Sequence, residues 1–177
     1  TQGLQPPCYN NTLALAHNDV DAMKVDYVDL LLLHFPPLFG CRKGSSSCTK
    51  MQQQWSALEQ FYHQNKTRAI GVSNYCTACL QCLMETATVA PMVNQMETHL
   101  GIPSNNHGLR PFCHTNNIVL EAYSPLAHGK VLHVPELVAI AATHNKTTAQ
   151  IALRYVLQLG GSDGLSPFVT SSSNPTH

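Results

Sequence analysis

The sequence predicts an α/β fold built on a parallel sheet, and three observations lead to that class. Short apolar runs alternate with segments of helical periodicity, and the connections between them are short. The apolar runs are continuous, as in the leucines at 30–33, which is expected of strands covered on both faces. Neither G-x-G-x-x-G nor a GKS/T sequence occurs, which argues against a Rossmann or P-loop sheet. An open doubly wound sheet and a (β/α) barrel both fit this pattern.

The first half of the chain is expected to alternate helices with strands. Thr49 is the expected N-cap of the second helix. The apolar side chains after it fall on one stripe, namely Met51, Trp55, Leu58 and Tyr62. In chain order the expected elements are a helix over 13–23, a strand over 28–33, the helix capped by Thr49, a strand over 69–72, a helix through 80–84 and a strand over 91–96.

The second half continues the alternation. Thr147 and Gln150 form a T-x-x-Q capping box at the start of the clearest helix, and Gly160 is expected to close that helix. In chain order the expected elements are a short helix near 107–116, a strand over 118–122, the loop SPLAHGKV, a helix that starts near Pro135, the capped helix and a strand at SPFVT. These strands are fewer than the eight of a closed barrel, so the unit is incomplete.

Composition argues against several classes of protein. Ten Lys and Arg balance ten Asp and Glu, so neither nucleic acid nor a membrane surface is expected as a partner. No apolar run approaches the roughly 20 residues that span a bilayer. The first residues, TQGLQPPCYNN, lack the layout of a signal peptide. We therefore expect a cytoplasmic protein and a single domain over 1–177.

The cysteines are expected to be reduced. The chain has seven of them, an odd number, and no signal peptide. Cys76, Cys79 and Cys82 follow CxxCxxC spacing, which can open a cluster-binding run, but the fourth cysteine of that pattern does not follow. The same spacing places the three thiols along one flank of a helix. We expect helical cysteines and no metal site, with a cysteine-rich metal module as an alternative.

Hydrogen-bonding side chains stand at the expected carboxyl ends of successive strands. They are His34, Ser73 with Asn74, Gln95, Tyr123 with Ser124, and the run 170–174. In a (β/α) barrel the carboxyl ends of the strands meet at one active-site mouth. A single histidine at a strand end is more often structural, but polar groups at five successive strand ends together predict a site.

Five segments resemble the aldo-keto reductase family in order and spacing. They are DYVDLLLLHFP, WSALEQFYHQNKTRAIGVSNY, VNQMETHL, EAYSPLAHGK and HNKTTAQIALRYVLQ, and the resemblance runs from about Val25 to Pro175. The family is a (β/α)8 barrel that uses a nicotinamide cofactor without a Rossmann domain. The resemblance therefore implies a partial (β/α)8 TIM barrel with about five of its eight strands present.

The resemblance also implies an activity, namely the NAD(P)H-dependent reduction of aldehydes and ketones to alcohols by hydride transfer from nicotinamide C4. His34 matches the catalytic histidine that hydrogen-bonds the substrate carbonyl oxygen and orients it. Ser73, Asn74 and Gln95 match the residues that bind the nicotinamide carboxamide, which needs both donors and acceptors. A small carbonyl compound is the implied substrate.

Three further positions match cofactor-binding residues of the family. Tyr123 matches the aromatic residue that stacks on the nicotinamide ring. Ser124 and Leu126 match the loop that approaches the pyrophosphate. Phe35 stands where many members carry Trp, so it keeps an aromatic wall for substrate but lacks the indole N–H.

The segment VTSSSNPTH departs from the family. Ser171 stands at the position of a Lys, and His177 near that of an Arg, that usually hold the 2′-phosphate of NADPH. Ser172 and Asn174 can still hydrogen-bond the phosphate or ribose. NADP is the expected cofactor because the family favours it, and NAD is the alternative.

The family's catalytic Tyr, Lys and Asp come from strands upstream of the matched segments. We therefore expect a fragment that lacks the N-terminal strands and the C-terminal segment, and that is inactive alone. The alternative to an enzyme is a non-catalytic, cofactor-binding regulatory subunit of the same fold.

Overall fold

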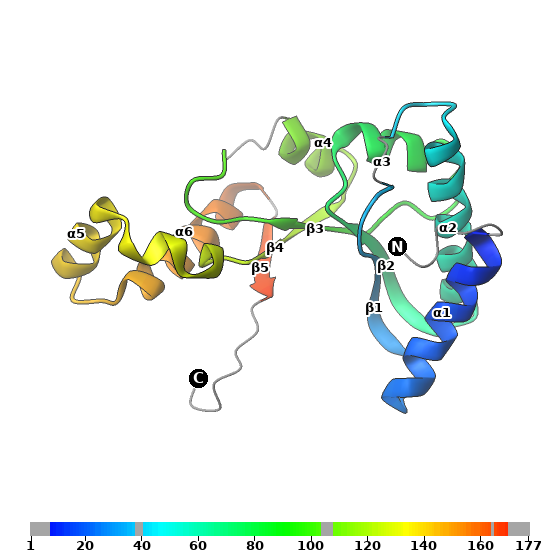
Figure 1. Cartoon of the computed structure of the whole chain (residues 1–177), viewed down its shortest axis with the longest axis horizontal. Helices are drawn as coiled ribbons and strands as arrows, with labels where there is room; N and C mark the ends of the chain where they lie inside the picture. The colour runs from blue at the N-terminus through cyan, green and yellow to red at the C-terminus, as the bar shows by residue number, and fades with distance from the viewer. Residues whose placement is uncertain (1–7, 38–40, 104–107, 164, 170–177) are drawn as a thin grey trace. The chain divides into compact units, whose positions relative to one another are not determined.

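A computed structural model describes residues 8–37, 41–103, 108–163 and 165–169. Helices and strands alternate along this chain (Figure 1). The strands are β1 (Val28–Leu33), β2 (Thr67–Ser73), β3 (Val93–Glu97), β4 (Val119–Tyr123) and β5 (Leu165–Val169). The helices are α1 (Cys8–Met23), α2 (Ser46–His63), α3 (Thr77–Met84), α4 (Leu109–Thr115), the 3-10 segment η3 (Ala127–His133), α5 (Pro135–Thr143) and α6 (Thr148–Asp163).

The strand order decides between the two α/β architectures. The strands pair in the order β1-β2-β3-β4-β5, so each strand lies beside its successor in the chain. The β1–β2 and β4–β5 pairs are parallel. A doubly wound sheet reverses direction at a switch point, whereas a barrel adds each strand next to the preceding one. The partial barrel expected from the sequence is confirmed.

Contacts divide the chain into two units, residues 1–94 and 95–177, with the boundary inside β3. The first unit contains α1, β1, α2, β2 and α3. The second contains α4, β4, η3, α5, α6 and β5. The single barrel domain over 1–177 stays a prediction.

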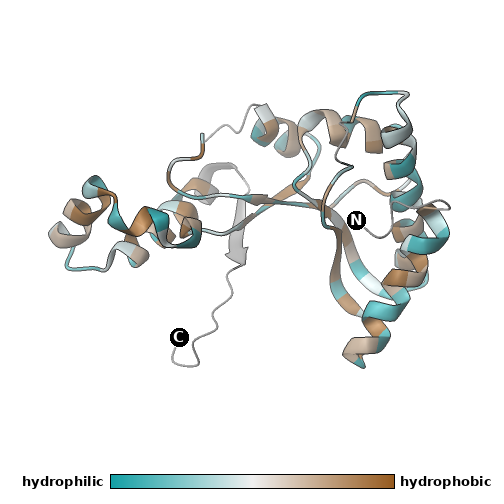
Figure 2. Cartoon of the chain, in the orientation of Figure 1, coloured by the Kyte–Doolittle hydropathy of each residue, from teal (hydrophilic) through white to brown (hydrophobic). Residues whose placement is uncertain are grey.

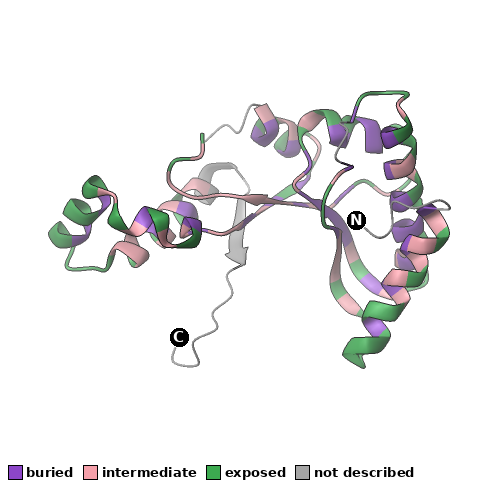
Figure 3. Cartoon of the chain, viewed as in Figure 1, coloured by how far each residue is buried: buried purple, intermediate pink, exposed green. Residues whose placement is uncertain are grey.

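The first unit has a helical layer packed on β1. Cys8, Thr12, Ala16 and Val20 are the buried residues of α1, and their spacing of four places them on one face. Ala16 and Val20 pack with Phe61 of α2, and Leu31 of β1 joins the cluster. Hydrophobic and buried residues occupy one side of these helices, and hydrophilic exposed residues the other (Figures 2 and 3). The helix expected over 13–23 therefore starts five residues earlier, at Cys8.

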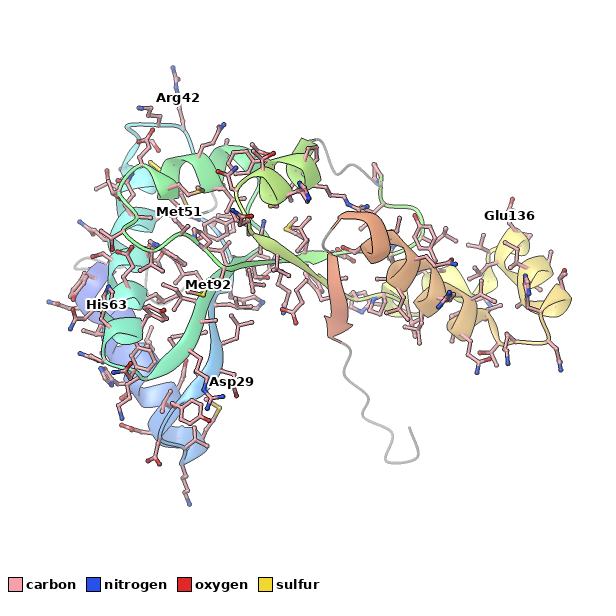
Figure 4. All side chains as sticks on the ribbon, turned by 180° about the vertical axis from the view of Figure 1, so that it is seen from behind. Asp29, Arg42, Met51, His63, Met92 and Glu136 are labelled. Atoms are coloured by element: carbon pink, nitrogen blue, oxygen red, sulfur yellow. A yellow bond between two sulfur atoms is a disulfide. The ribbon has the colours of Figure 1, made fainter. Side chains whose placement is uncertain are left out.

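The start of α2 differs from the expectation. Ser45 is the N-cap, and its side chain accepts a hydrogen bond of 3.1 Å from the backbone N–H of Cys48. The predicted cap, Thr49, lies inside the helix, where its hydroxyl donates to the Ser45 carbonyl at 3.4 Å. The apolar stripe alone could not reveal this earlier start, because the first turn has only one apolar side chain, Cys48. The stripe itself is confirmed at Met51, which is fully buried and labelled on α2 in Figure 4.

Gly71 allows β1 and β3 to pack closely against β2. A Cβ built on Gly71 would lie 2.5 Å from the carbonyl oxygen of Val93 and 2.8 Å from Leu32 Cδ2. Any side chain there would displace backbone, because Val93 contributes its carbonyl. The glycine of the GVSN segment is therefore required for packing.

A buried carboxylate fixes the connection between α3 and β3. Oε1 of Glu59 accepts hydrogen bonds from the backbone N–H groups of Thr88 and Val89, at 2.6 and 2.8 Å. Trp55 donates its indole N–H to the carbonyl of Val89 at 2.9 Å. Buried polar groups require partners of this kind, so α2 anchors the chain that leads into β3.

The cysteines are not all reduced, contrary to expectation. Cys41 is bonded to Cys79 and Cys48 to Cys82, with Cα–Cα distances of 4.6 and 5.9 Å. The first bond joins the segment before α2 to α3, and the second joins the first turn of α2 to α3. Spacing within CxxCxxC could not reveal the pairing, because each partner lies more than thirty residues away. Lys43 also contacts α3's end, where its hydrogen bond with Glu85 at 2.8 Å raises the pKa of the lysine.

The second unit confirms the predicted capping box. The backbone N–H of Gln150 donates to Thr147 Oγ1 at 3.1 Å, and that of Thr147 donates to Gln150 Oε1 at 2.9 Å. The helix that follows, α6, continues to Asp163, so the prediction that Gly160 ends it was wrong. Ala152 of α6 packs with Leu137 of α5 and Val131 of η3. No helix in the described part of the chain has the length and hydropathy to cross a membrane.

Candidate active site

His34 and Phe35 follow β1 directly and form an exposed aromatic pair. Their ring centroids are 4.4 Å apart with an interplanar angle of 40°. Phe35 is 52% exposed, which is unusual for so large an apolar side chain. The apolar strand therefore ends in an imidazole and a phenyl ring that are both accessible to a small molecule.

Asn74 connects the ends of β1 and β2. Its Nδ2 donates to the backbone carbonyl of His34 at 3.1 Å and to Oγ of Ser73 at 2.9 Å. Ser73, the last residue of β2, is only 2% exposed. Asn74 has a φ of 63°, a left-handed conformation that asparagine tolerates better than most residues. Three residues predicted for the site thus form one hydrogen-bonded group in the first unit.

A second asparagine holds the turn that carries this group. Asn94 of β3 is fully buried, and its Nδ2 donates to the carbonyl of Tyr75 at 2.8 Å. Its Oδ1 accepts from the Tyr75 backbone N–H at 3.4 Å. The Tyr75 side chain is also fully buried, and its hydroxyl has no hydrogen-bond partner among the described residues. Burial raises the pKa of Tyr75 well above its ordinary value, so the phenol is neutral at physiological pH.

Gln95 lies in the second unit, and not at a strand end as expected. It is the third of the five residues of β3, which continues to Glu97. Its Nε2 donates to Oε2 of Glu121 on β4 at 3.0 Å. Both residues are half-buried. The carboxylate therefore fixes the orientation of the glutamine amide.

Tyr123, Ser124 and Leu126 form the end of β4 and the turn after it. Tyr123 is the last residue of β4, and its carbonyl accepts from the Thr98 N–H at 3.0 Å. The carbonyl of Ser124 accepts from the Ala127 N–H at 2.9 Å. Left-handed φ values at Ser124, Ala127 and His128 wind the backbone tightly here. Successive N–H groups in turns of mixed handedness can bind anions.

Ser172 and Asn174 lie outside the described residues, as does the whole run from Thr170. The remaining predicted residues form two local groups. His34, Phe35, Ser73 and Asn74 belong to the first unit, and Gln95, Tyr123, Ser124 and Leu126 to the second. Within the described residues no cluster of three or more His, Cys, Asp or Glu side chains could hold a metal ion.

A pocket in the first unit lies at the opposite ends of the strands. It has a volume of about 500 Å³ and includes Tyr27, just before β1, and Thr67, the first residue of β2. Arg68 stacks over the Tyr27 ring at 4.3 Å and pairs with Asp29 at 2.9 Å. Active sites of (β/α) barrels lie at the carboxyl ends of strands, so this pocket is not the candidate site.

Sequence reasoning missed two residues that support the site. Asn94 was treated only as part of a strand, although a buried Asn within an apolar run signals a specific hydrogen-bonding task. Glu121 was quoted in EAYSPL without a role, and it orients Gln95. A polar residue inside an otherwise apolar strand was the available signal in both cases.

Comparison with known proteins identifies the relatives of this chain. The model of the aldo/keto reductase family matches residues 10–177. A glyoxal reductase of Bacillus subtilis is 40% identical over 152 residues, which cover 86% of this chain and 51% of that protein. An aldo-keto reductase from a Medee basin deep-sea metagenome library has a TM-score of 0.75 at 35% identity, covering 91% of this chain and 56% of that one.

A second solved relative contains bound NADPH. A variant of Gox0644 in complex with NADPH has a TM-score of 0.79 at 30% identity, and the match covers 95% of this chain and 56% of that one. The chain thus spans about half the length of the relatives it matches. Because the family model covers nearly the whole sequence, the chain belongs to the aldo/keto reductase family.

Proposed function

We propose that the protein containing this chain reduces aldehydes or ketones to alcohols with NADPH, within a single barrel domain that includes residues 1–177. The observation that carries the proposal is the hydrogen-bonded group of His34, Ser73 and Asn74 at the carboxyl ends of β1 and β2. Membership of the aldo/keto reductase family supports oxidoreductase chemistry on carbonyl compounds.

In this proposal His34 binds and orients the substrate. Its imidazole donates a hydrogen bond to the carbonyl oxygen, which polarises the carbonyl and holds the reacting carbon in place. The contact with Phe35 restricts the imidazole, and the exposed phenyl ring provides an apolar wall for the rest of the substrate. Ring tilt and exposure thus suit a small, partly apolar carbonyl compound.

The chain's polar groups fit a nicotinamide cofactor, which supplies the hydride when bound. Ser73, Asn74 and Gln95 offer the mixture of donors and acceptors that a carboxamide requires. The hydrogen bonds from Asn74 to its neighbours and from Gln95 to Glu121 fix both amides before a ligand arrives. Tyr123 would lie against the ring, and the turn at Ser124 and Leu126 would hold phosphate.

The cofactor preference and the cellular location belong to the same proposal. NADPH is preferred to NADH because the family favours it, with Ser172 and Asn174 as the proposed phosphate or ribose ligands. The proposed location is the cytoplasm. The two disulfides make a direct test of that location necessary, because disulfides persist mainly in oxidising compartments.

The test uses the open reading frame that encodes this chain, expressed at full length. Absorbance of NADPH, then NADH, is followed with a panel of aldehydes that begins with glyoxal, because one relative is a glyoxal reductase. We expect His34→Ala to lower kcat/KM about a hundredfold, as misplacement of a reacting group does. The control is His63→Ala, since His63 is exposed and lines the pocket at the opposite strand ends.

Two results would contradict the proposal. Equal activity of His34→Ala and His63→Ala would remove His34 from the reaction. Tight binding of NADPH without turnover of any carbonyl compound would instead indicate a cofactor-binding regulatory subunit.

A further inference from the structure

Three cysteine sulfurs lie together where α3 begins. Cys76 is the N-cap of α3, is exposed, and is not part of a disulfide. Its Sγ lies 3.5 Å from Sγ of Cys79, which is already bonded to Cys41. Exchange begins when a thiolate approaches one sulfur of a disulfide, and this contact provides that approach within the folded chain.

We propose that Cys76, Cys79 and Cys41 form a thiol–disulfide exchange site. Cys76 loses its proton to solvent, and the thiolate attacks Sγ of Cys79. The Cys76–Cys79 bond forms as the Cys79–Cys41 bond breaks, and Cys41 leaves as a thiolate that takes up a proton. One disulfide and one thiol are present before and after, so the step needs no oxidant or reductant.

Burial favours an internal reaction over attack by a thiol from solution. Cys79 and Cys41 are only 4% and 7% exposed, whereas Cys76 is exposed and already contacts Cys79. The product would contain a Cys-x-x-Cys disulfide at the start of a helix. Thiol–disulfide oxidoreductases use that arrangement, so the product is a favourable geometry.

Exchange would alter one of the covalent links next to the candidate site. Cys41 belongs to the segment that follows Phe35, and Cys76 lies two residues after Asn74. In one isomer that segment is bonded to α3 through Cys79, and in the other Cys79 is bonded within its own helical turn. The proposal does not depend on the reductase function, because the step uses only the three cysteines.

The test maps disulfides in the 177-residue chain, purified without reductant. Samples are incubated at mildly alkaline pH, where thiolates form, quenched in acid and digested with pepsin so that the bonds do not rearrange. We expect two species, a Cys41–Cys79 link and a peptide with an internal Cys76–Cys79 bond, the rarer on the order of a few per cent or more. A sample kept in acid throughout fixes the starting distribution.

Two variants make the result specific. Cys76→Ser keeps a good N-cap residue, and it should show only the Cys41–Cys79 link. Cys113→Ser removes a buried cysteine of the second unit and should behave as the unaltered chain does. The Cys48–Cys82 bond should survive in every sample, because exchange is confined to the three cysteines.

Three outcomes would overturn the proposal. In the first, the Cys76–Cys79 bond is no more abundant than in Cys76→Ser. In the second, Cys41 and Cys79 are recovered as thiols before incubation. In the third, Cys48 and Cys82 also scramble, which would indicate general unfolding instead of a local reaction.

Discussion

The ends of β2 and β4 both carry predicted cofactor ligands, but different interactions hold them. At the end of β2, Asn94 binds the backbone of Tyr75 from nineteen residues away, and the Cys41–Cys79 bond spans thirty-eight. At the end of β4, backbone hydrogen bonds join residues three apart, as from Ala127 to Ser124 and from Gly129 to Leu126. The end of β2 therefore depends mainly on tertiary contacts, whereas the turn after β4 is held mainly by its own backbone, with one distant hydrogen bond from Thr98 to Tyr123.

The largest loss of stability should come from Gly71→Ala, which disrupts the packing of β2 against β1 and β3. We expect the free energy of unfolding to fall by about 3 kcal/mol, because the added methyl meets the Val93 carbonyl. The matched control, Gly129→Ala in the β4 turn, has open space around it and should cost about 1 kcal/mol, from its φ of 88° alone. Urea unfolding followed by circular dichroism measures both. Equal losses would mean that the two ends do not differ in packing.

Asn94→Ala tests the distant support of Tyr75. It leaves a buried N–H and a buried carbonyl without their partner, so we expect a loss of about 2 kcal/mol in unfolding free energy. Hydrogen exchange should also become faster at the Tyr75 amide. Thr147→Ala is the local counterpart in the second unit, because it removes only a helix cap, worth about 1 kcal/mol. An unchanged exchange rate at the Tyr75 amide would mean that the Asn94 side chain does not stabilise the Tyr75 backbone.

The smallest effect is on the pH dependence of stability, to which the buried Tyr75 should contribute more than an exposed or half-buried tyrosine does. Burial raises its pKa in the folded chain above the ordinary value of 10.0, so the unfolded state loses the proton first. The stability that this group contributes is present below pH 10.0 and is lost as pH rises through the folded-state pKa, by about 1.4 kcal/mol per pH unit. Tyr75→Phe should flatten the fall in stability between about pH 9 and about pH 11. The control is Tyr62→Phe, at a tyrosine that is only half-buried, and an equal flattening there would contradict the assignment.

The contrast between local and long-range interactions also explains which features could be predicted from the sequence. Local signals were sufficient for β1, which has its expected bounds, and for the Thr147–Gln150 capping box. The sequential strand order agrees with the barrel that the resemblance implied. The N-cap of α2 at Ser45 was missed because Cys48 is the only apolar side chain in the first turn of the helix.

Long-range pairings escaped prediction at the candidate site. The Asn94–Tyr75 bonds and the two disulfides join residues whose proximity depends on the finished fold. A single sequence records the residue types but not the pairs. The roles assigned to His34, Ser73, Asn74 and Gln95 stay predictions until activity is measured.

The two disulfides overlap along the chain, since Cys48 lies between Cys41 and Cys79, and Cys82 lies beyond both. Opening the Cys41–Cys79 bond would therefore not set its segment free. Cys41 is still only seven peptide bonds from Cys48, whose own bond holds it to α3, so Cys41 can move at most about 24 Å from that anchor. A short tether keeps the effective concentration of the released thiol high. The overlap makes the departure of Cys41 reversible, because its return is an event within one molecule.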